Sequence, residues 1–550
     1  IQVNLPAGGD WLRVSPTSGT TDAAQQVAPT VTLLVDPGKL RAGVHVALLT
    51  LSAPGALNSP QTAIVLVNML PRGTPPVGTI NPLGLIFTSP TGASGTLSQA
   101  ISMASTGGQP LQFLVRTQTQ AGGGWLSVTP EQGVLLSSSE SATLSVQARP
   151  AGLAAGVYLG SVILSFGTGV TQEVAIALVV APGATTSAFP FDATPSSRPG
   201  TWDSGPGILA VCTPRRLVIV ETKLGNRFSL QTGWPIPMLV QATDDCGSTV
   251  TSATVTASFT GGEPPLVFQN LRNGYYSATW VPATKGSIGV TIRAASAGLE
   301  DGVFQFAGAL GQASPLPLLF RDGWVNAASF DRFKPLAPGM IFSLFGNNLA
   351  EGKNLASQIP LPRTLGNLKA TLGGHEVPLF YADGGQVNGQ VPFEAPLGTA
   401  SLVVTGRGSA GAPGTVTIVG AQPGIFTVSQ SGTGQGVVLD AQYNLVDSNH
   451  PVKAGDAVVI YATGLGATNP PVATGQAAPA VPPLALVSTP VKVAIGGVEA
   501  AVEFAGLAPG FVGLYQVNAR LPAGVTAGNA VPLVITQNGV PSNTVTIAVQ

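Results

Sequence analysis

Short apolar runs interrupted by glycine and proline are the feature that most constrains how this chain can fold. Its 550 residues include 70 glycines and 47 prolines, yet 44% of the residues are apolar and spread along the whole length. Runs rich in Val, Ile, Leu and Thr between turn residues are typical of β-strands. Each segment can bury a core, so disorder is disfavoured. We therefore predict an all-β protein of about four or five domains in series.

The second module predicted along the chain, residues 83–182, is the clearest one. A linker rich in proline and glycine, around residues 71–82, separates it from the chain start. Seven short strand-like runs at regular spacing predict an Ig-like β-sandwich. These runs are residues 84–89, 97–105, 111–119, 125–128, 141–148, 156–166 and 171–180.

The chain start repeats the second half of that module. GGDWLRVSPTSG at 8–19 matches GGGWLSVTPEQG at 122–133, and LRAGVHVALLTLS at 40–52 matches LAAGVYLGSVILS at 153–165. No residues before Ile1 match the two strands expected in 84–105. We therefore predict that residues 1–72 form a module of the same kind that lacks its first two strands.

This W-L-x-V-[ST]-P-x-x-G pattern, followed by a G-V-[YH] strand, resembles the BACON-like Ig-type modules of secreted bacterial proteins. The resemblance covers residues 1–70 and 83–181 and implies secretion. Some modules of this kind are suspected of binding carbohydrate, and many serve as spacers. Trp11 and Trp125 could stack on sugars if they were exposed. A repeated W-L-x-V strand more often buries its tryptophan, so we predict that both are core residues.

Residues 183–207 form the clearest linker, rich in Pro, Ser, Thr and Gly, and a third module is predicted over 208–310. Its sequence resembles an invasin- or filamin-type Ig module. The chain has two cysteines, Cys212 and Cys246, both in this module. In a β-rich chain with few charges, one disulfide within the module is the favoured interpretation, and two buried thiols are the alternative.

The last third holds a second repeat. APGMIFSLFGNNLA at 337–350 corresponds to KAGDAVVIYATGLGA at 453–467, and both copies later carry QVN. We predict a tandem pair of Ig-like sandwiches at 318–428 and 433–550, with hairpin turns at the Gly-Gly pairs 373–374 and 496–497. The pair resembles the Solibacter-type C-terminal domain of large secreted proteins, a family with no assigned activity. The five predicted segments, 1–72, 83–182, 208–310, 318–428 and 433–550, are called modules one to five below.

Catalytic and metal-binding chemistry has little support in the sequence. Three histidines in 550 residues, His45, His375 and His450, stand in no metal or nucleophile motif. Asp244 and Asp245 could bind calcium, but a bare Asp-Asp pair more often lies in a solvated turn. We predict no enzyme, no metal and no cofactor.

Charge and hydropathy exclude two further classes. Only 9% of residues are charged and the net charge is −1, so nucleic-acid binding is disfavoured. No apolar run reaches the 18 or so residues that a membrane helix requires. With the predicted disulfide, these features favour a secreted or cell-surface protein.

Two functional hypotheses remain. The leading one is a structural subunit whose incomplete first module accepts a β-strand from another copy of the chain, head to tail, and so builds a fibre. Its assembly groove would include Ile1, Val3, Leu5 and Trp11, and the donor would be 187–191 or the terminal run 542–550.

The alternative is an adhesin or carbohydrate-binding accessory protein with a cell-surface polysaccharide as partner. It requires exposed aromatic side chains, for which Trp202 and Trp234 are the candidates. Alternation along 274–282 places Tyr276 and Trp280 on one face, predicted to be core, and Tyr275 on the other.

Overall fold

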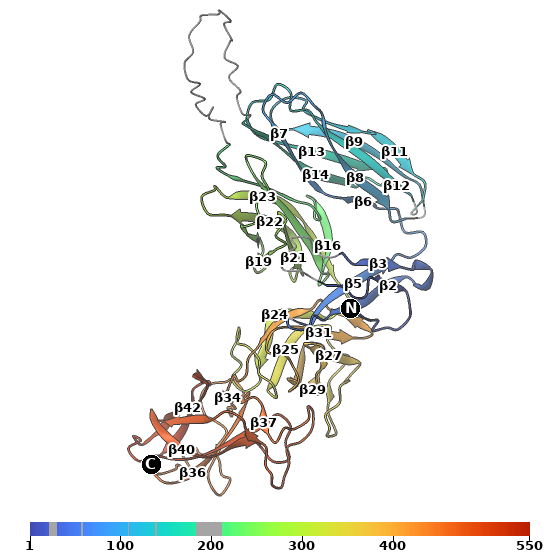
Figure 1. The fold of residues 1–550 in the computed structure, drawn as a ribbon. Coiled ribbons are helices and arrows are strands. Elements are labelled where there is room, and N and C mark those ends of the chain that lie inside the picture. The colour runs from blue at the N-terminus through green and yellow to red at the C-terminus, as the bar shows by residue number, and fades with distance from the viewer. Residues whose placement is uncertain (21–29, 57–58, 108, 138–139, 183–211) are drawn as a thin grey trace, which may run out of the picture. The chain divides into compact units, whose positions relative to one another are not determined.

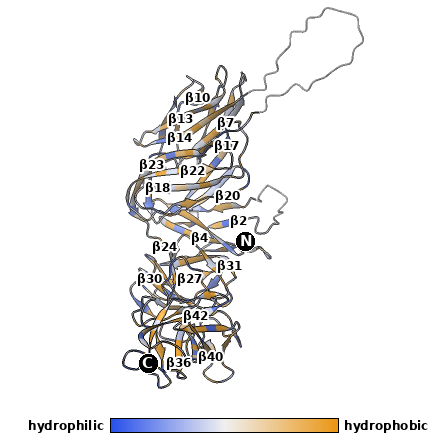
Figure 2. Cartoon of the chain, turned by 90° about the vertical axis from the view of Figure 1, so that its left-hand side faces the viewer, coloured by the Kyte–Doolittle hydropathy of each residue, from blue (hydrophilic) through white to orange (hydrophobic). Residues whose placement is uncertain are grey.

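The fold is all-β, with several β-sandwich sheets in series (Figure 1). A computed structural model describes the chain except for residues 21–29, 57–58, 108, 138–139 and 183–211. In the described part, the one helical element is a 3₁₀ turn, Pro37–Lys39. Apolar residues are distributed over strands from the first module to the last (Figure 2). Two compact units result, one of residues 1–19, 30–69 and 315–550, and the other built around 70–314.

Module one contains a three-stranded sheet in the order β1-β4-β5 and a two-stranded sheet of β2 and β3. All pairings in both sheets are antiparallel. The strands are β1 (Gln2–Asn4), β2 (Leu12–Ser15), β3 (Thr32–Val35), β4 (Gly43–Leu51) and β5 (Gln61–Met69).

Module two has the same arrangement with more strands. Its sheets have the orders β10-β12-β8-β6 and β11-β9-β13-β14-β7, with β7 parallel to β14. The strands are β6 (Gly78–Asn81), β7 (Gly84–Pro90), β8 (Leu97–Ser105), β9 (Leu111–Thr119), β10 (Leu126–Thr129), β11 (Gln132–Leu135), β12 (Ser141–Ala148), β13 (Gly156–Phe166) and β14 (Thr171–Ala181). β6 lies inside the segment predicted to be a linker, a correction explained by its pairing with β8.

Module three is a sandwich of sheets β15-β17-β21-β20 and β16-β23-β22-β18-β19. The strands are β15 (Leu217–Glu221), β16 (Phe228–Thr232), β17 (Ile236–Asp244), β18 (Thr254–Phe259), β19 (Leu266–Val267), β20 (Gln269–Asn270), β21 (Tyr275–Trp280), β22 (Gly286–Ala295) and β23 (Gly302–Ala313). Within their compact unit, modules two and three share a small apolar cluster. Its buried members are Ile86, Ala177, Val179, Val218 and Val220.

Module four consists of sheets β24-β25-β30-β29-β26 and β28-β27-β31-β32, with β33 also paired to β31. The strands are β24 (Leu318–Asn326), β25 (Ile341–Asn347), β26 (Asn354–Leu355), β27 (Leu368–Leu372), β28 (His375–Glu376), β29 (Leu379–Ala382), β30 (Gln386–Gln390), β31 (Gly398–Gly406), β32 (Ser409–Ala410) and β33 (Gly414–Ile418).

Module five repeats this pattern, but one long strand, β40, pairs with both β41 and β39 and joins the two halves into an 11-stranded sheet. The strands are β34 (Gly424–Ile425), β35 (Val438–Leu439), β36 (Ala457–Thr463), β37 (Thr468–Asn469), β38 (Leu486–Val487), β39 (Val491–Ile495), β40 (Val498–Leu507), β41 (Tyr515–Arg520), β42 (Gly528–Gln537), β43 (Val540–Pro541) and β44 (Val545–Val549). β34 lies in the range predicted for module four, but it pairs with β36 of module five.

The Gly-Gly pairs of modules four and five lie at the predicted turns. Gly373 and Gly374 have φ of 57° and 83°, and Gly496 and Gly497 have 60° and 81°. Positive φ at both central residues is the geometry of a type I′ hairpin, which glycine adopts without steric cost. This prediction is confirmed.

Candidate assembly site

Trp11 occupies the centre of the core of module one. Its side chain is 4% exposed and packs with Leu12, Ala47 and Leu49. The corresponding Trp125 of module two is 3% exposed, and its indole N–H donates to the carbonyl oxygen of Ala121 at 3.0 Å. The prediction that both tryptophans are core residues is confirmed. Neither offers a face on which a sugar could stack.

The four predicted groove residues lie on the side of module one where the apolar side chains are already packed. Val3 faces Leu49 across the β1–β4 ladder, and Val3 and Leu5 both pack against the cluster around Trp11. Ile1 is half-buried, and its ammonium group donates to Thr17 O at 2.6 Å. Their role in assembly stays a prediction. The exposed apolar side chains of module one lie on other strands.

Strand β3 exposes side chains whose counterparts in module two are buried. Across β2, Leu33 and Val35 face Val14 and Leu12, as Val146 and Ala148 face Val128 and Leu126 across β10. Leu33 is 40% exposed and Val35 38%, whereas Val146 and Ala148 are both 0% exposed. The difference has a direct cause, since β12 has β8 on its other side and β3 pairs with β2 alone among the described strands.

Strand β5 differs from its counterpart β14 in the same way. Val65 and Val67 are half-buried, whereas Ile176 and Leu178, at the equivalent positions opposite β13, are 1% and 0% exposed. In module two the parallel strand β7 covers that side of β14. In the described residues β5 pairs only with β4, so it is the edge of its sheet.

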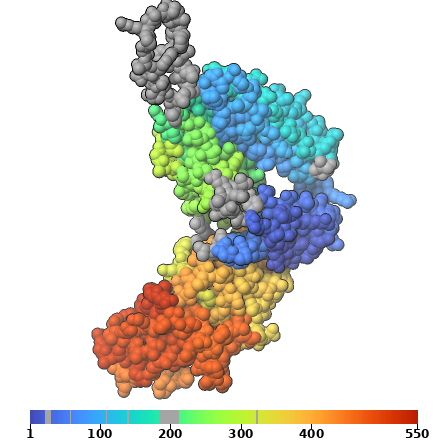
Figure 3. Space-filling model, viewed as in Figure 1, coloured from blue at the N-terminus to red at the C-terminus, as the bar shows by residue number. Residues whose placement is uncertain are grey.

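A third exposed side chain lies on β4. Leu51 is 40% exposed, while Leu164, at the same place in the repeated segment, is 0% exposed. We call the unpaired sides of β3 and β5, with the exposed Leu33, Val35 and Leu51, the open edge. Module one is dark blue in Figure 3 and module two lighter blue and cyan.

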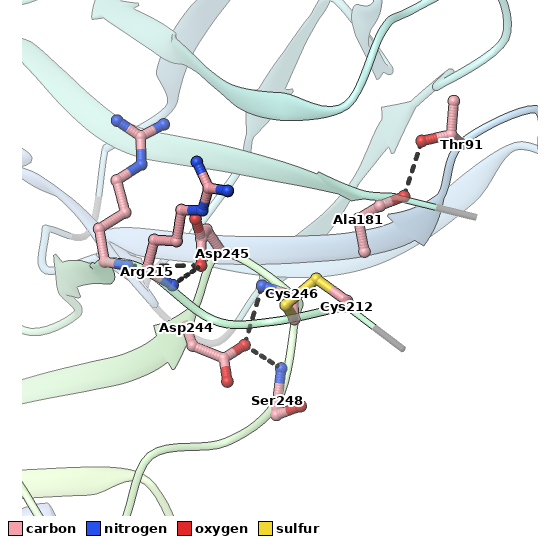
Figure 4. The surroundings of a disulfide bond; sticks show 9 residues. Thr91, Ala181, Cys212, Arg215, Asp244, Asp245, Cys246 and Ser248 are labelled. Atoms are coloured by element: carbon pink, nitrogen blue, oxygen red, sulfur yellow. Dashed lines mark hydrogen bonds between the residues drawn. A yellow bond between two sulfur atoms is a disulfide. The ribbon is translucent and has the colours of Figure 1, made fainter. Parts of the chain in front are cut away.

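The disulfide joins Cys212 and Cys246, with a Cα–Cα distance of 5.8 Å (Figure 4). Asp244 and Asp245 flank it but are occupied by backbone amides. Asp244 Oδ1 accepts from the backbone N–H groups of Cys246 at 2.9 Å and Ser248 at 2.8 Å. Asp245 Oδ1 accepts from Arg215 N at 2.8 Å. Both carboxylates therefore hold the turn and the chain that enters β15.

The aromatic candidates for sugar binding give little support to that hypothesis. Trp202 lies outside the described residues, and Trp234 is half-buried against the core of module three. Tyr276 is 0% exposed and Trp280 3%, as predicted for the core-facing side, while Tyr275 is half-buried.

A polar cleft of about 860 Å³ lies within the compact unit that contains modules one and four. Its wall includes Asn4, Thr50, Glu351, Lys369 and Arg407. No aromatic side chain lines this cleft in the described part of the chain. It therefore lacks the stacking platform that sugar recognition commonly uses.

No sequence pattern predicts the burial of one carboxyl group. Glu221, at the end of β15, is 1% exposed, and its Oε1 accepts from the backbone N–H groups of Lys223, Leu224 and Leu239. Its Oε2 has no hydrogen-bond partner among the described residues. Burial raises the pKa of Glu221 from 4.5 to about 7, although the three N–H donors lower it.

Metal-ligand clusters and membrane-spanning helices are both absent from the described residues. They contain no group of three or more His, Cys, Asp or Glu side chains that could hold a metal ion. Within the same residues, no helix is long and apolar enough to span a membrane.

Tandem β-sandwich modules, one of them with an open edge, define the class of this protein. Residues 78–180 match the family model described as the viral BACON domain, which coincides closely with module two. No curated protein matches the chain.

Solved structures match at low identity. One is the Bacteroides ovatus mixed-linkage glucan utilization locus SGBP-B in complex with a mixed-linkage heptasaccharide, at 13% identity, 64% coverage of this chain and 71% of that chain, and a TM-score of 0.27. Another is the CsuC–CsuE chaperone–tip adhesion subunit pre-assembly complex of Acinetobacter baumannii, at 10% identity, 43% and 100% coverage, and a TM-score of 0.19. The fibronectin(III)-like modules of Clostridium thermocellum CbhA match at 12% identity, 43% and 95% coverage, and a TM-score of 0.15. At these values nothing about function or assembly follows for this chain.

Proposed function

We propose that this protein is a non-catalytic extracellular structural subunit that assembles with other copies of itself by β-strand addition at the open edge of module one. The observation that carries the proposal is the contrast at one register position, where Leu33 is 40% exposed and Val146 is 0% exposed. A sheet edge beside exposed apolar side chains is a template for pairing with another chain.

The energetics favour a covered edge. Full burial of a Leu or Val side chain contributes about 1.5–3 kcal/mol, so covering Leu33, Val35 and Leu51 contributes roughly 2–4 kcal/mol in total. Backbone hydrogen bonds along β3, and along β5 beyond Thr62, add to this. Thr62 N–H already donates to Ser401 Oγ at 3.3 Å.

Head-to-tail donation does not close on itself, so it produces a filament. Of the two predicted donors, residues 187–191 lie outside the described residues. The terminal run contains β44, whose Val545 and Ile547 are 0% exposed in the core of module five. Donating that run would empty the core of its own module, so it is the poorer donor.

Three features support an extracellular location. The disulfide is typical of oxidising compartments. The BACON match over 78–180 agrees with the resemblance of modules one and two to modules of secreted proteins. The resemblance of residues 318–550 to the Solibacter-type C-terminal domain points the same way.

The carbohydrate-binding alternative receives less support from the molecule. Of its named aromatics, Trp234 packs against a core and Trp202 is not described. A glycan array on the full chain tests it, with binding lost in Trp234→Ala as the result that favours a binding protein.

Light scattering and negative-stain microscopy of the purified full chain over a wide concentration range test the proposal. We expect filaments that the double variant Leu33→Asp/Val35→Asp no longer forms. The matched control is Val134→Asp, which changes a side chain 46% exposed on the edge strand β11 of module two. A chain that stays monomeric at every concentration contradicts the proposal.

A further inference from the structure

We infer that the junction between modules two and three is a pH-sensitive device, in which the charge on Glu221 controls how firmly residues 222–226 hold module two. We call residues 222–226 the junction turn. The inference goes beyond the proposed function, because it concerns another part of the chain and requires no second copy. It rests on the contacts of the junction turn and on the surroundings of the Glu221 carboxyl group.

The junction turn makes side-chain hydrogen bonds to both sheets of module two. Lys223 Nζ donates to Asn81 Oδ1 at 2.8 Å, and Asn226 Nδ2 donates to Glu173 Oε2 at 3.2 Å. Asn81 ends β6 and Glu173 lies on β14, and these strands belong to different sheets. The junction turn is therefore a clasp on module two that depends on its own folded shape.

The backbone of module two lies directly against Glu221. Leu83 N–H donates to Thr222 O at 2.8 Å. A Cβ at Gly84, where β7 begins, would lie 2.3 Å from Glu221 O, so this close approach requires glycine. A displacement of Glu221 therefore has to move β7 or break its contact with it.

The side chains of β15 alternate between the two modules. Val218 and Val220 pack in the apolar cluster shared with module two, whereas Leu217 and Ile219 pack in the core of module three. Glu221 continues the second set, so its carboxyl group points into module three. The buried carboxyl group and the contacts with module two thus belong to one short segment of the chain.

The interior of module three favours the neutral form of Glu221. The side chain is 1% exposed, and its Oε2 has no hydrogen-bond partner among the described residues. A buried charge with an unsatisfied oxygen is costly, and burial raises the pKa of Glu221 to about 7. Two N–H donors to Oε1, those of Lys223 and Leu224, belong to the junction turn. The turn must therefore open before the carboxylate can reach water.

The ionisation of this site belongs to Glu221 itself. The strands and turns packed against it carry few charged side chains, and none of these forms an ion pair with Glu221 in the described part of the chain. They are Lys223 and Arg227, both exposed, Glu173 on β14 and Asp244 on β17. Burial and backbone N–H donors alone set the pKa of Glu221.

The expected size of the effect follows from two pKa values of Glu221. The ordinary value of 4.5 applies when the turn is open, and the value of about 7 applies when it is closed. Because the pKa is raised in the closed state, the closed junction is favoured in full below pH 4.5 and loses this advantage as the pH rises through 7. The ratio of open to closed junctions should rise about 30-fold between pH 5.5 and pH 8.5.

Hydrogen exchange of the full chain, corrected for the intrinsic exchange rate at each pH, tests the inference. The reporter is the Leu83 amide, which is bonded to Thr222 O in the closed junction. We expect its protection to fall about 30-fold from pH 5.5 to pH 8.5, while the amides of β12 in the same module keep theirs. Protection at Leu83 that does not change with pH overturns the inference.

Two matched variants assign the pH dependence. Glu221→Gln keeps the shape of the side chain but cannot ionise, so it should abolish the change at Leu83. Glu263→Gln alters another buried carboxyl group of module three, which accepts from the N–H groups of Ala283 and Thr284. It should leave the change intact. The inference fails if Glu221→Gln keeps the dependence or if Glu263→Gln loses it.

A third variant tests the clasp without touching the carboxyl group. Asn81→Ala removes the partner of Lys223 Nζ, so it should lower the protection of the Leu83 amide at every pH and preserve the change between pH 5.5 and pH 8.5. Unaltered protection in this variant contradicts the role of the junction turn. Circular dichroism at both pH values establishes that each variant is folded.

Discussion

Modules one and two carry the same W-L motif and bury the same tryptophan, yet their edges differ. Trp11 and Trp125 are 4% and 3% exposed, so the two tryptophans are equally buried. By contrast, Leu33, Val35 and Leu51 are about 40% exposed, and module two has buried residues at the equivalent positions. The W-L motif therefore accounts for the buried centre of each module. Whether the edge of the module is covered depends on the neighbouring strands.

The largest expected effect separates the two tryptophans. Trp125→Ala should destabilise module two by about 3–5 kcal/mol, because a large buried side chain leaves a cavity. Trp11→Ala should cost less, since the smaller core of module one has more room to collapse. Hydrogen exchange resolved by segment measures both, and equal losses would break the comparison.

Reduction of Cys212–Cys246 tests how far module two depends on module three. The disulfide spans 34 positions, and its loss should destabilise module three by about 3–4 kcal/mol in the chain-entropy model. Modules one and two contain no cysteine. Urea unfolding with and without reductant measures both modules. If reduction also destabilises module two by a similar free energy, the stability of module two depends on module three through the shared apolar cluster.

A pH titration examines the same region by another route. The pKa of Glu221 is raised from 4.5 to about 7, so the folded state holds its proton more tightly than the unfolded state. The contribution of Glu221 to the free energy of unfolding should be fully present below pH 4.5 and fall by about 3 kcal/mol as the pH rises through 7. Glu221→Gln should flatten this dependence in urea titrations, and a variant that keeps the full slope would assign it to another group.

The smallest effect is the most direct test of the open edge. Val146→Ala should destabilise module two by about 2 kcal/mol, whereas Leu33→Ala should destabilise module one by less than about 1 kcal/mol. The expected order is the reverse of what side-chain size alone gives. If Leu33→Ala proves as costly as Val146→Ala, Leu33 is covered in solution.

Much of the fold was predictable because alternation and turn residues are local signals. All seven strands expected in module two are present, and Tyr276 and Trp280 face the core as alternation indicated. β6 was missed because its four residues stand among prolines and glycines, and its strand character comes from pairing with β8. The module boundaries themselves stay predictions.

The candidate site was predictable only in part. The sequence repeat predicted exposed apolar surface in module one, but around Ile1 and Val3. In the structure β1 pairs with β4 and fills that side, so the exposure falls on β3 and β4. Glu221 could not be predicted, because its burial depends on strands and chain segments that meet only in the folded unit.

The fluorescence of Trp11 can report whether the open edge of module one is covered. An indole that lies in a small core, a few side chains away from an uncovered rim, emits at a wavelength set by how much water reaches it. Filling the rim should shift that emission to the blue and narrow it, and the other five tryptophans of the chain would stay as they are. Occupancy could then be followed in real time without attaching a dye.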